Sequence, residues 1–364
     1  MSYGRTRIKG LTYCDTRRAF RGFTLLTPVH GQSVWMIDMF GEVVKDWQFP
    51  FPAGSYGELL PGGNILYVGR DTNHDLFEPE GATGIIIEAD SGAHILWRYE
   101  DSRLHHGAFR MKNGNTLVMK WVDLPPDFSR KVFGRQESNV QDTPTLGDVI
   151  QEIRPDGSVA WEWIAHEHVD PDELARCPLC PPDTWLHANS VSELQNGDLL
   201  VSFCKVNTVG IIDKKTKKLV WRWGTDGELA HQHAPVMLDN GNILIFDNGY
   251  HPNGLAQNYS RLVEVARKKE KVWSYDGPSG GDMKQQIYSS MWSNCQRLAN
   301  GNSLGCEGTT GRIFEVTKGG DLVWEWVNYL PGDREVHNPI DSRSLPLFGA
   351  LRYGMDYPGL RWMQ

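Results

Sequence analysis

Histidines and small polar residues recur at one fixed distance before a series of glycine-containing turns. In the stretch HQHAPVMLDNGNILIFDNGY, His233 stands seven residues before the first Asn-Gly pair. The same count back from four related turns gives Ser55, His106, Asn189 and Ser293. A purely structural strand would more often carry an apolar residue at such a position. The spacing therefore predicts a polar cluster that repeated strands bring together.

Two further histidines, His187 and His231, lie two residues before Asn189 and His233. Residues two apart on a strand share a face, so we expect both imidazoles near the cluster. An imidazole can act near neutral pH as an acid, base, nucleophile or metal ligand. A lone histidine is more often structural, and polar residues can simply solvate a channel. The convergence of three or more imidazoles favours a functional site.

The elements that must position these residues repeat along the chain. A tryptophan strand recurs at intervals of 50 to 64 residues, and it follows a short apolar strand and a polar turn in each repeat. A hairpin around a glycine-containing turn completes the unit. We interpret the tryptophans as core that packs the repeats together, not as ligand contacts. They are Trp47, Trp97, Trp161, Trp221, Trp273 and Trp324.

Four short antiparallel strands repeated every fifty to sixty residues are typical of a β-propeller blade. Six repeats predict an all-β, six-bladed propeller that forms a single domain over residues 1–364. The repeat near Phe23 lacks its first strand, so we expect the C-terminal segment RSLPLFGALRYGMD to pair with the N-terminal strands and close the ring. A long loop insertion is expected at about residues 123–184. A stack of separate β-sandwiches is the alternative fold, but it does not explain the shared period.

Charge and composition narrow the class of protein. The net charge of −8 and the pI near 5.8 argue against nucleic-acid and membrane partners. The start of the chain, MSYGRTRIKGLTYC, has no apolar signal core, so we expect a cytoplasmic protein. Six cysteines in a chain of this length are not a disulfide framework. A closed ring needs no partner for its edges, so monomer and homodimer are equally compatible with the sequence.

The chain resembles the arylsulfotransferase (arylsulfate sulfotransferase) family over roughly residues 20–328. The most specific stretches are LHANSVSELQNGDLLVSFCKVNTVGIID, HQHAPVMLDNGNILIFDNG and CEGTTGRIFEVTKGGDLVWEWVN. The resemblance implies a six-bladed propeller whose substrate is a small aromatic molecule bearing an oxyanion. It also implies ping-pong transfer of a sulfuryl group between phenols through a sulfated histidine, with no cofactor required.

Matching motifs extend this resemblance to single residues. His233 in HQHAP resembles the histidine that accepts the sulfuryl group. His187 and Asn189 in LHAN resemble a pair that binds the sulfate oxygens and the bridging oxygen, and His106 in LHHG resembles another sulfate-contacting histidine. Lys205 in SFCKVN occupies a place where the family usually has arginine. Lysine supplies the charge there without the planar bidentate fork.

Other polar residues are candidates for the walls of the site. The segment FDNGYHPNGLAQNYSR follows the His233 hairpin, and its Asn248, Tyr250 and Arg261 suit an aromatic anion because rings stack and arginine pairs with oxyanions. Trp121 follows the His106 hairpin, and we expect it and His231 in the same wall. The alternative is an ordinary loop held by turns of its own side chains.

A possible metal site lies in the expected insertion. The stretch HEHVDPDELARCPLC places His166, His168, Cys177 and Cys180 within fifteen residues, a set that suits structural zinc. A surface dithiol and a local disulfide are the alternatives.

Two other functions remain open from the sequence. His106, His187 and His233 are candidates to hold a channel metal in a hydrolase, lyase or oxidoreductase, because three imidazoles often leave a metal one open position. The other is a non-catalytic propeller that binds a ligand or a protein.

Overall fold

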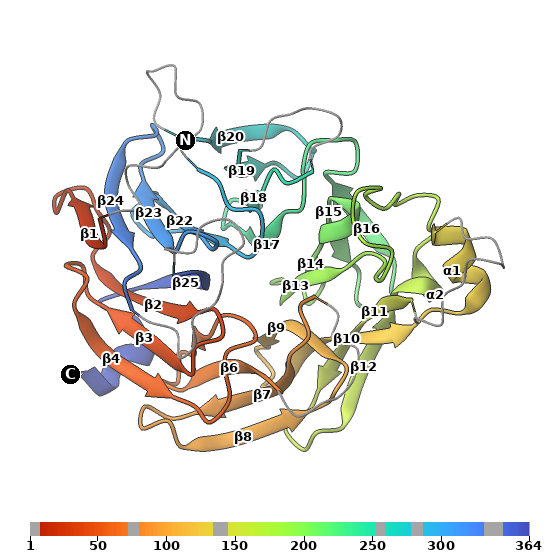
Figure 1. Cartoon of the computed structure of the whole chain (residues 1–364), viewed down its shortest axis with the longest axis horizontal. Coiled ribbons are helices and arrows are strands. Elements are labelled where there is room, and N and C mark those ends of the chain that lie inside the picture. The colour runs from red at the N-terminus through yellow and green to blue at the C-terminus, as the bar shows by residue number, and fades with distance from the viewer. Residues whose placement is uncertain are drawn as a thin grey trace.

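Six antiparallel sheets form a ring around a central axis in the computed structural model (Figure 1). Five sheets have four strands and one has five, which confirms the predicted all-β, six-bladed propeller. No helix in the described part of the chain is long and apolar enough to cross a membrane. The structure describes residues 8–71, 80–133, 145–251, 259–277, 287–330 and 345–363.

Each blade runs outward from the axis in the same strand order. The innermost strands are β25 (Leu347–Gly354), β5 (Glu58–Leu59), β9 (Leu104–Arg110), β13 (Ala188–Glu193), β17 (His233–Met237) and β21 (Asn294–Arg297). The second strands are β2 (Gly22–Pro28), β6 (Ile65–Arg70), β10 (Thr116–Asp123), β14 (Leu199–Phe203), β18 (Ile243–Asp247) and β22 (Ser303–Glu307). The third strands are β3 (Ser33–Ile37), β7 (Gly84–Ala89), β11 (Leu146–Ile153), β15 (Thr208–Ile212), β19 (Arg261–Val265) and β23 (Arg312–Val316). The outermost strands are β4 (Val43–Gln48), β8 (Ile95–Glu100), β12 (Val159–Ile164), β16 (Leu219–Trp223), β20 (Lys271–Tyr275) and β24 (Leu322–Val327).

Short helical turns complete the described secondary structure. They are α1 (Pro126–Phe133), α2 (Ala165–His168), η3 (Cys204–Val206) and η4 (Pro358–Met363).

The two ends of the chain close the ring, as predicted. β25 supplies the missing innermost strand of the first blade and pairs antiparallel with β2, from Gly22 opposite Gly354 to Pro28 opposite Leu347. β1 (Gly10–Cys14) adds a fifth strand to the outer edge of the last blade by pairing with β24. These pairings cover edges that would otherwise be open to other chains.

The segment at about residues 123–184 is not one long loop insertion, and that expectation is corrected. β11 and β12 lie inside it as the third and fourth strands of a blade, because β11 pairs with β10 along its whole length. Two connections flank these strands, one carrying α1 and the other, residues 165–187, carrying α2. Residues 134–144 of the first connection lie outside the described residues.

The repeated tryptophans fasten each blade to the next. In five of the six outermost strands the indole N–H donates to a main-chain oxygen in the outer turn of the following blade, at 2.8–3.0 Å. The exception is Trp47, whose indole packs edge-on against Trp362 in η4. The repeat thus fixes the angle between blades, and so the positions of the innermost strands around the axis.

The repeated turn fixes the height of the five innermost strands that it follows. At Asn240-Gly241, Gly241 takes a φ of +81°, which a residue with a side chain would adopt only with strain. The side-chain oxygen of Asn240 accepts the N–H of Asn242, an Asx turn that recurs at three of the other hairpins. Residues at one offset from these turns therefore start at a similar level in the channel.

Candidate active site in the central channel

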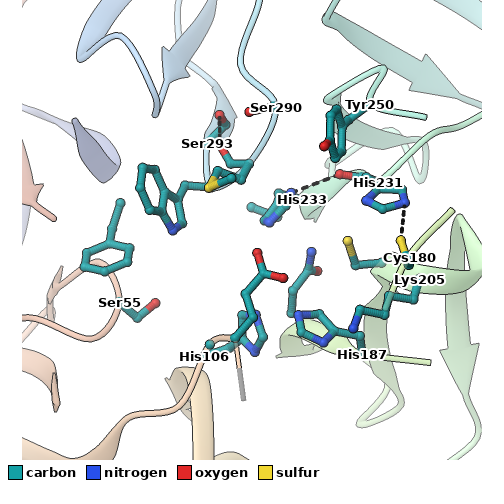
Figure 2. Close-up of a pocket in the computed structure, with 18 of the residues that line it drawn as sticks. Ser55, His106, Cys180, His187, Lys205, His231, His233, Tyr250, Ser290 and Ser293 are labelled. Atoms are coloured by element: carbon teal, nitrogen blue, oxygen red, sulfur yellow. Dashed lines mark hydrogen bonds between the residues drawn. The ribbon is translucent and has the colours of Figure 1, made fainter. Parts of the chain in front are cut away.

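A cavity of about 390 Å³ opens where the innermost strands begin. All five residues at the repeated offset line it, namely Ser55, His106, Asn189, His233 and Ser293. His187, Lys205, His231 and Tyr250 line it as well, and Figure 2 shows His106 and His187 on the wall that faces His233. The predicted polar cluster is therefore a real cavity wall built from several blades.

Bulged backbone aims these side chains, a feature that strand periodicity did not predict. The ladders of β9, β13 and β17 each shift register beside the cavity. His106, His187 and His231 have φ of 53°, 58° and 56°, values uncommon for residues with side chains. His187 and His231 precede their strands, so the two-residue spacing does not put them on a shared strand face with Asn189 and His233. They reach the cavity because the left-handed backbone re-aims them.

The ring of His233 is held in one tautomer. Its Nδ1 lies 2.8 Å from Oδ1 of Asn248 and 3.1 Å from the main-chain oxygen of His231. The amide nitrogen of Asn248 donates to the main-chain oxygens of Ser289 and Trp292, which orients Oδ1 towards the ring. Since both neighbours of Nδ1 are acceptors, Nδ1 carries the proton and Nε2 keeps its lone pair.

Burial keeps the cavity histidines neutral. It lowers the pKa of His233 to about 4, and it lowers the pKa of His106 and of His231 to about 3. Burial also lowers the pKa of His187 well below its ordinary value. Each ring therefore offers one donor and one acceptor at neutral pH, and the cavity gains no positive charge from them.

Lys205 lines the cavity, but its charge is paired with the carboxylate of Asp183. Its Nζ lies 2.5 Å from a carboxylate oxygen of Asp183 and donates to Oγ1 of Thr184 at 2.7 Å. Thr184 Oγ1 lies 3.1 Å from Nδ1 of His187. Thr184 Oγ1 also lies 3.3 Å from Oδ1 of Asp183, so the hydroxyl can donate either to Asp183 or to Nδ1 of His187. Lys205 thus acts through Thr184 on His187, and it does not stand as a free cation.

Buried polar residues lie behind both His106 and His187. Nδ1 of His106 lies 2.9 Å from Nδ1 of His105, whose Nε2 lies 3.6 Å from a carboxylate oxygen of Asp148. Asp148 also accepts the main-chain N–H groups of His187 and Ala188. Burial raises the pKa of Asp148 to about 7. This carboxyl group therefore holds the main chain at His187 from behind, whereas its separation from His105 is too long for a hydrogen bond.

Three predicted ligand-binding residues lie behind the cavity wall, and their predicted role is corrected. Trp121 stacks on the ring of His105 with centroids 3.7 Å apart. Arg261 forms an ion pair with Asp247 at 2.8 Å and donates to the main-chain oxygen of Glu228. Asp247 is buried, so the arginine is held there to neutralise it. Asn248 likewise stands behind His233, whereas Tyr250 and His231 do line the cavity.

The predicted zinc group of His166, His168, Cys177 and Cys180 does not come together. His166 and His168 lie in α2, where their rings pack near Phe128 and against Trp163. The chain then leaves α2 and carries Cys180 to the cavity wall, with Cys177 beside it. The reason is that α2 is packed against the core of its own blade, away from the channel.

The alternative channel metal at His106, His187 and His233 is also not supported by the geometry. Among the described residues, the one group of three or more potential ligands whose donor atoms converge does not contain these histidines. The rings of His106 and His187 meet edge to face, with centroids 4.8 Å apart, and their Nδ1 atoms turn to His105 and Thr184.

Several contributors to the site were missed from the sequence. His105 could have been found from its place beside His106 in LHHG. Asp148 sits in the middle of a buried strand, and Asp183 and Thr184 lie in a connection, so local spacing gave no sign of them. Trp292 and Phe348 form an aromatic side of the cavity, with ring centroids 5.8 Å apart.

The fold and the cavity define a six-bladed propeller with a histidine-lined channel, and comparison with known proteins gives its family. A model of the arylsulfotransferase (ASST) family matches residues 73–329, so the chain belongs to that family. No curated protein sequence matches the chain.

Solved structures share the fold at low sequence identity. A protein of unknown function from Bacteroides caccae has a TM-score of 0.55 and 13% identity, covering 91% of this chain and 98% of its own. A chain of a nidogen/laminin complex has a TM-score of 0.50 and 7% identity, covering 90% of this chain and 97% of its own. At such identities these similarities support the propeller fold alone.

Proposed function

We propose that this protein transfers a sulfuryl group from an aryl sulfate to a phenolic acceptor by way of His233. The observation that carries the proposal is the pair of oxygen acceptors, on Asn248 and His231, at Nδ1 of His233. They leave Nε2 as the nucleophilic nitrogen of a ring that lines the cavity. Membership of the arylsulfotransferase family supports the same reaction class.

The transfer takes place in two displacements at sulfur. In the first, the Nε2 lone pair forms an N–S bond while the bond from sulfur to the aryl oxygen breaks. Its electrons leave on the phenolate, which takes a proton from solvent. In the second, the oxygen of an acceptor phenol gives up its proton to solvent and attacks sulfur, and the N–S bond breaks. His233 returns to its starting state. The first phenol leaves before the acceptor phenol reacts, which is a ping-pong mechanism.

Hydrogen-bond donors supply the stabilisation of negative charge. His187 lines the cavity with a ring that the contact between its Nδ1 and Thr184 orients, and it donates from Nε2 when Thr184 gives its proton to Nδ1. Asn189 donates one amide hydrogen to the main-chain oxygen of Gln232 and keeps another for a ligand. Because Lys205 is paired with Asp183, the sulfuryl oxygens are held mainly by neutral donors in a buried setting, where such dipoles act strongly.

The cavity suits a small aromatic substrate. Its volume of about 390 Å³ falls within the usual range of small-molecule sites. Trp292 and Phe348 offer ring surfaces on one side, and the histidines that bind the sulfuryl group lie on another. An aryl ring and its anionic group can therefore be held at the same time.

A labelled intermediate tests the proposal. The full chain is mixed with nitrophenyl sulfate without acceptor, and we expect a burst of one nitrophenol per chain and a His233 peptide heavier by one sulfuryl group. Adding phenol should discharge the label and restore turnover. His233→Ala should abolish both the burst and the label, and His168→Ala, which changes a ring stacked on Trp163 outside the cavity, should keep both.

Two results would overturn the proposal. One is full turnover by folded His233→Ala protein. The other is the absence of nitrophenol release and of labelled peptide across a panel of aryl sulfates, which would favour a non-catalytic propeller that binds its ligand.

A further inference from the structure

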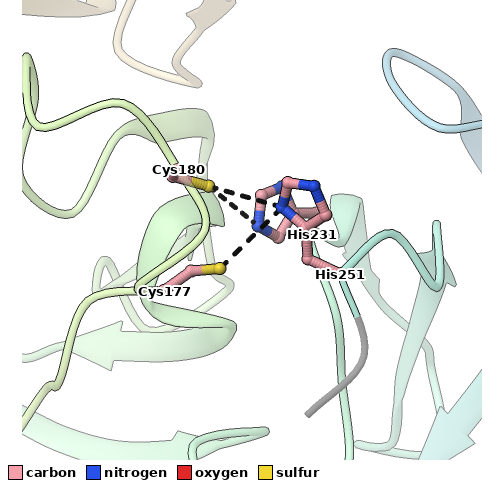
Figure 3. Close-up of side chains that lie close together, drawn as sticks. All are labelled: Cys177, Cys180, His231 and His251. Atoms are coloured by element: carbon pink, nitrogen blue, oxygen red, sulfur yellow. Dashed lines mark hydrogen bonds between the residues drawn. The ribbon is translucent and has the colours of Figure 1, made fainter. Parts of the chain in front are cut away.

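Two cysteines and two histidines converge at the edge of the cavity (Figure 3). The ligand atoms of Cys177, Cys180, His231 and His251 all lie within 4.8 Å of one another. Cys180 Sγ lies 3.3 Å from Nε2 of His231, and both sulfurs lie 3.9 Å from Nδ1 of His251. We propose that these four residues bind one structural zinc ion.

Three contacts match the shape that zinc requires, and the widest separation, up to 4.8 Å, would shorten by about 1 Å when the ion binds. Zn–S bonds of about 2.3 Å and Zn–N bonds of about 2.0–2.1 Å in a tetrahedron place neighbouring ligand atoms roughly 3.4–3.8 Å apart. The observed contacts of 3.3 and 3.9 Å lie within a few tenths of an ångström of that range. Both imidazoles turn a ring nitrogen towards the sulfurs, as Figure 3 shows. Two thiolates and two imidazoles form a common zinc ligand set.

The main chain already holds the ligands in place. The N–H of Cys177 donates to the main-chain oxygen of Lys205 at 2.7 Å, and that of Cys180 donates to the oxygen of Cys177, closing a turn between the sulfurs. The N–H of His231 donates to the side-chain oxygen of Asn207 at 2.9 Å.

The left-handed backbone of His231 and His251 is unfavourable, and binding a ligand would offset this cost. His231 and His251 have φ of 56° and 53°. Such a conformation is unfavourable for a residue with a side chain, and it persists where the surroundings require it. Metal ligation gives a reason for both imidazoles to face the cysteines.

The ion would fasten three separate segments of the cavity wall. Cys177 and Cys180 come from the connection between β12 and β13, His231 from the connection before β17, and His251 from the loop after β18. Cys180, His231 and His251 also line the cavity. Four protein ligands fill the tetrahedral shell, so the ion has no open position for a substrate and its role is structural.

The site does not depend on the reaction proposed above. Zn²⁺ with two thiolates is electrically neutral, so it would shape the cavity without drawing in an anion. His233 follows His231 by two residues and Tyr250 directly precedes His251, so the ion would position both neighbours.

Metal analysis tests the proposal without any assay of activity. The full chain is purified without chelators, and we expect one zinc per chain by elemental mass spectrometry. After replacement by cobalt, we expect the thiolate-to-cobalt charge-transfer absorption and the strong visible bands of a tetrahedral site. Cys180→Ser and His251→Ala should each lower the bound metal at least tenfold. Cys204→Ser and His168→Ala are matched controls that should keep it, and circular dichroism checks that each variant is folded.

Three outcomes would overturn it. The first is metal-free protein that also fails to bind added zinc. The second is a disulfide between Cys177 and Cys180 in protein purified under argon, detected as the loss of two titratable thiols. The third is full metal content in folded Cys180→Ser and His251→Ala. His251→Ala keeps the test valid if a cysteine variant does not fold, because His251 is only partly buried.

Discussion

Asn248 is the residue whose replacement tests the tautomer argument most directly. It is fully buried, and its Oδ1 lies 2.8 Å from Nδ1 of His233. Its amide nitrogen donates to the main-chain oxygens of Ser289 and Trp292 at 2.8 and 3.3 Å. In Asn248→Ala, one of the two acceptors for the Nδ1 proton is lost, while the main-chain oxygen of His231 at 3.1 Å remains.

The magnitude follows from the cost of an unmet buried hydrogen bond. Asn248→Ala leaves the Nδ1 proton with the main-chain oxygen of His231 alone and removes a donor from the oxygens of Ser289 and Trp292, and losing a buried hydrogen-bond partner costs about 1–3 kcal/mol. If that cost falls on the orientation of His233 for attack, the rate of the first displacement drops by about 5- to 150-fold. His233→Ala, which removes the nucleophile, should lose the reaction entirely. Asn248→Ala should therefore fall between the parent chain and His233→Ala.

The assay is the single-turnover burst of nitrophenol, measured alongside urea unfolding. Asn328→Ala is the matched control, because Asn328 is equally buried, donates to the main-chain oxygen of Leu345 and accepts the N–H of Leu330. Asn328 lies outside the cavity lining, so the Asn328→Ala protein should lose similar stability without a slower burst. If folded Asn248→Ala reacts as fast as Asn328→Ala, the inference that Asn248 orients the nucleophile is refuted.

Two further predictions concern the strand that closes the propeller and the pH dependence of the free energy of unfolding. Arg352 on the closing strand pairs with Glu315 at 2.7 Å, and both side chains are fully buried. Arg352→Met should lower the free energy of unfolding by about 3–5 kcal/mol in urea titrations, and adding Glu315→Gln should recover part of it; parent-like stability of Arg352→Met would contradict the role of this pair. Burial raises the pKa of Glu58 to about 7, so its contribution to stability is complete below the ordinary carboxyl pKa and is lost as pH rises through about 7. Between roughly pH 5 and pH 8 the parent should lose up to about 3 kcal/mol relative to Glu58→Gln, and equal pH slopes in the two proteins would count against this.

The sequence by itself determined the propeller and the level of the cavity residues. Tryptophans at one period, such as Trp161 and Trp221, specify identical blade contacts, since each indole meets the outer turn of the next blade. Asn-Gly turns fix the ends of four innermost strands, so the offset that selects His106 and His233 also selects a common height. Both are local patterns that the repeat copies around the ring, so the linear sequence displays them.

Only the tertiary structure decided which atoms meet. The partner of Lys205 is Asp183, twenty-two residues away, because η3 and the connection before β13 fold against each other. Cys177 and Cys180 face His231 and His251. The histidines of α2 are closer to the cysteines in sequence, but α2 packs into its own blade. Such contacts depend on how connections of unequal length cross the channel mouth. They lie outside the repeat, so no spacing along the chain encodes them.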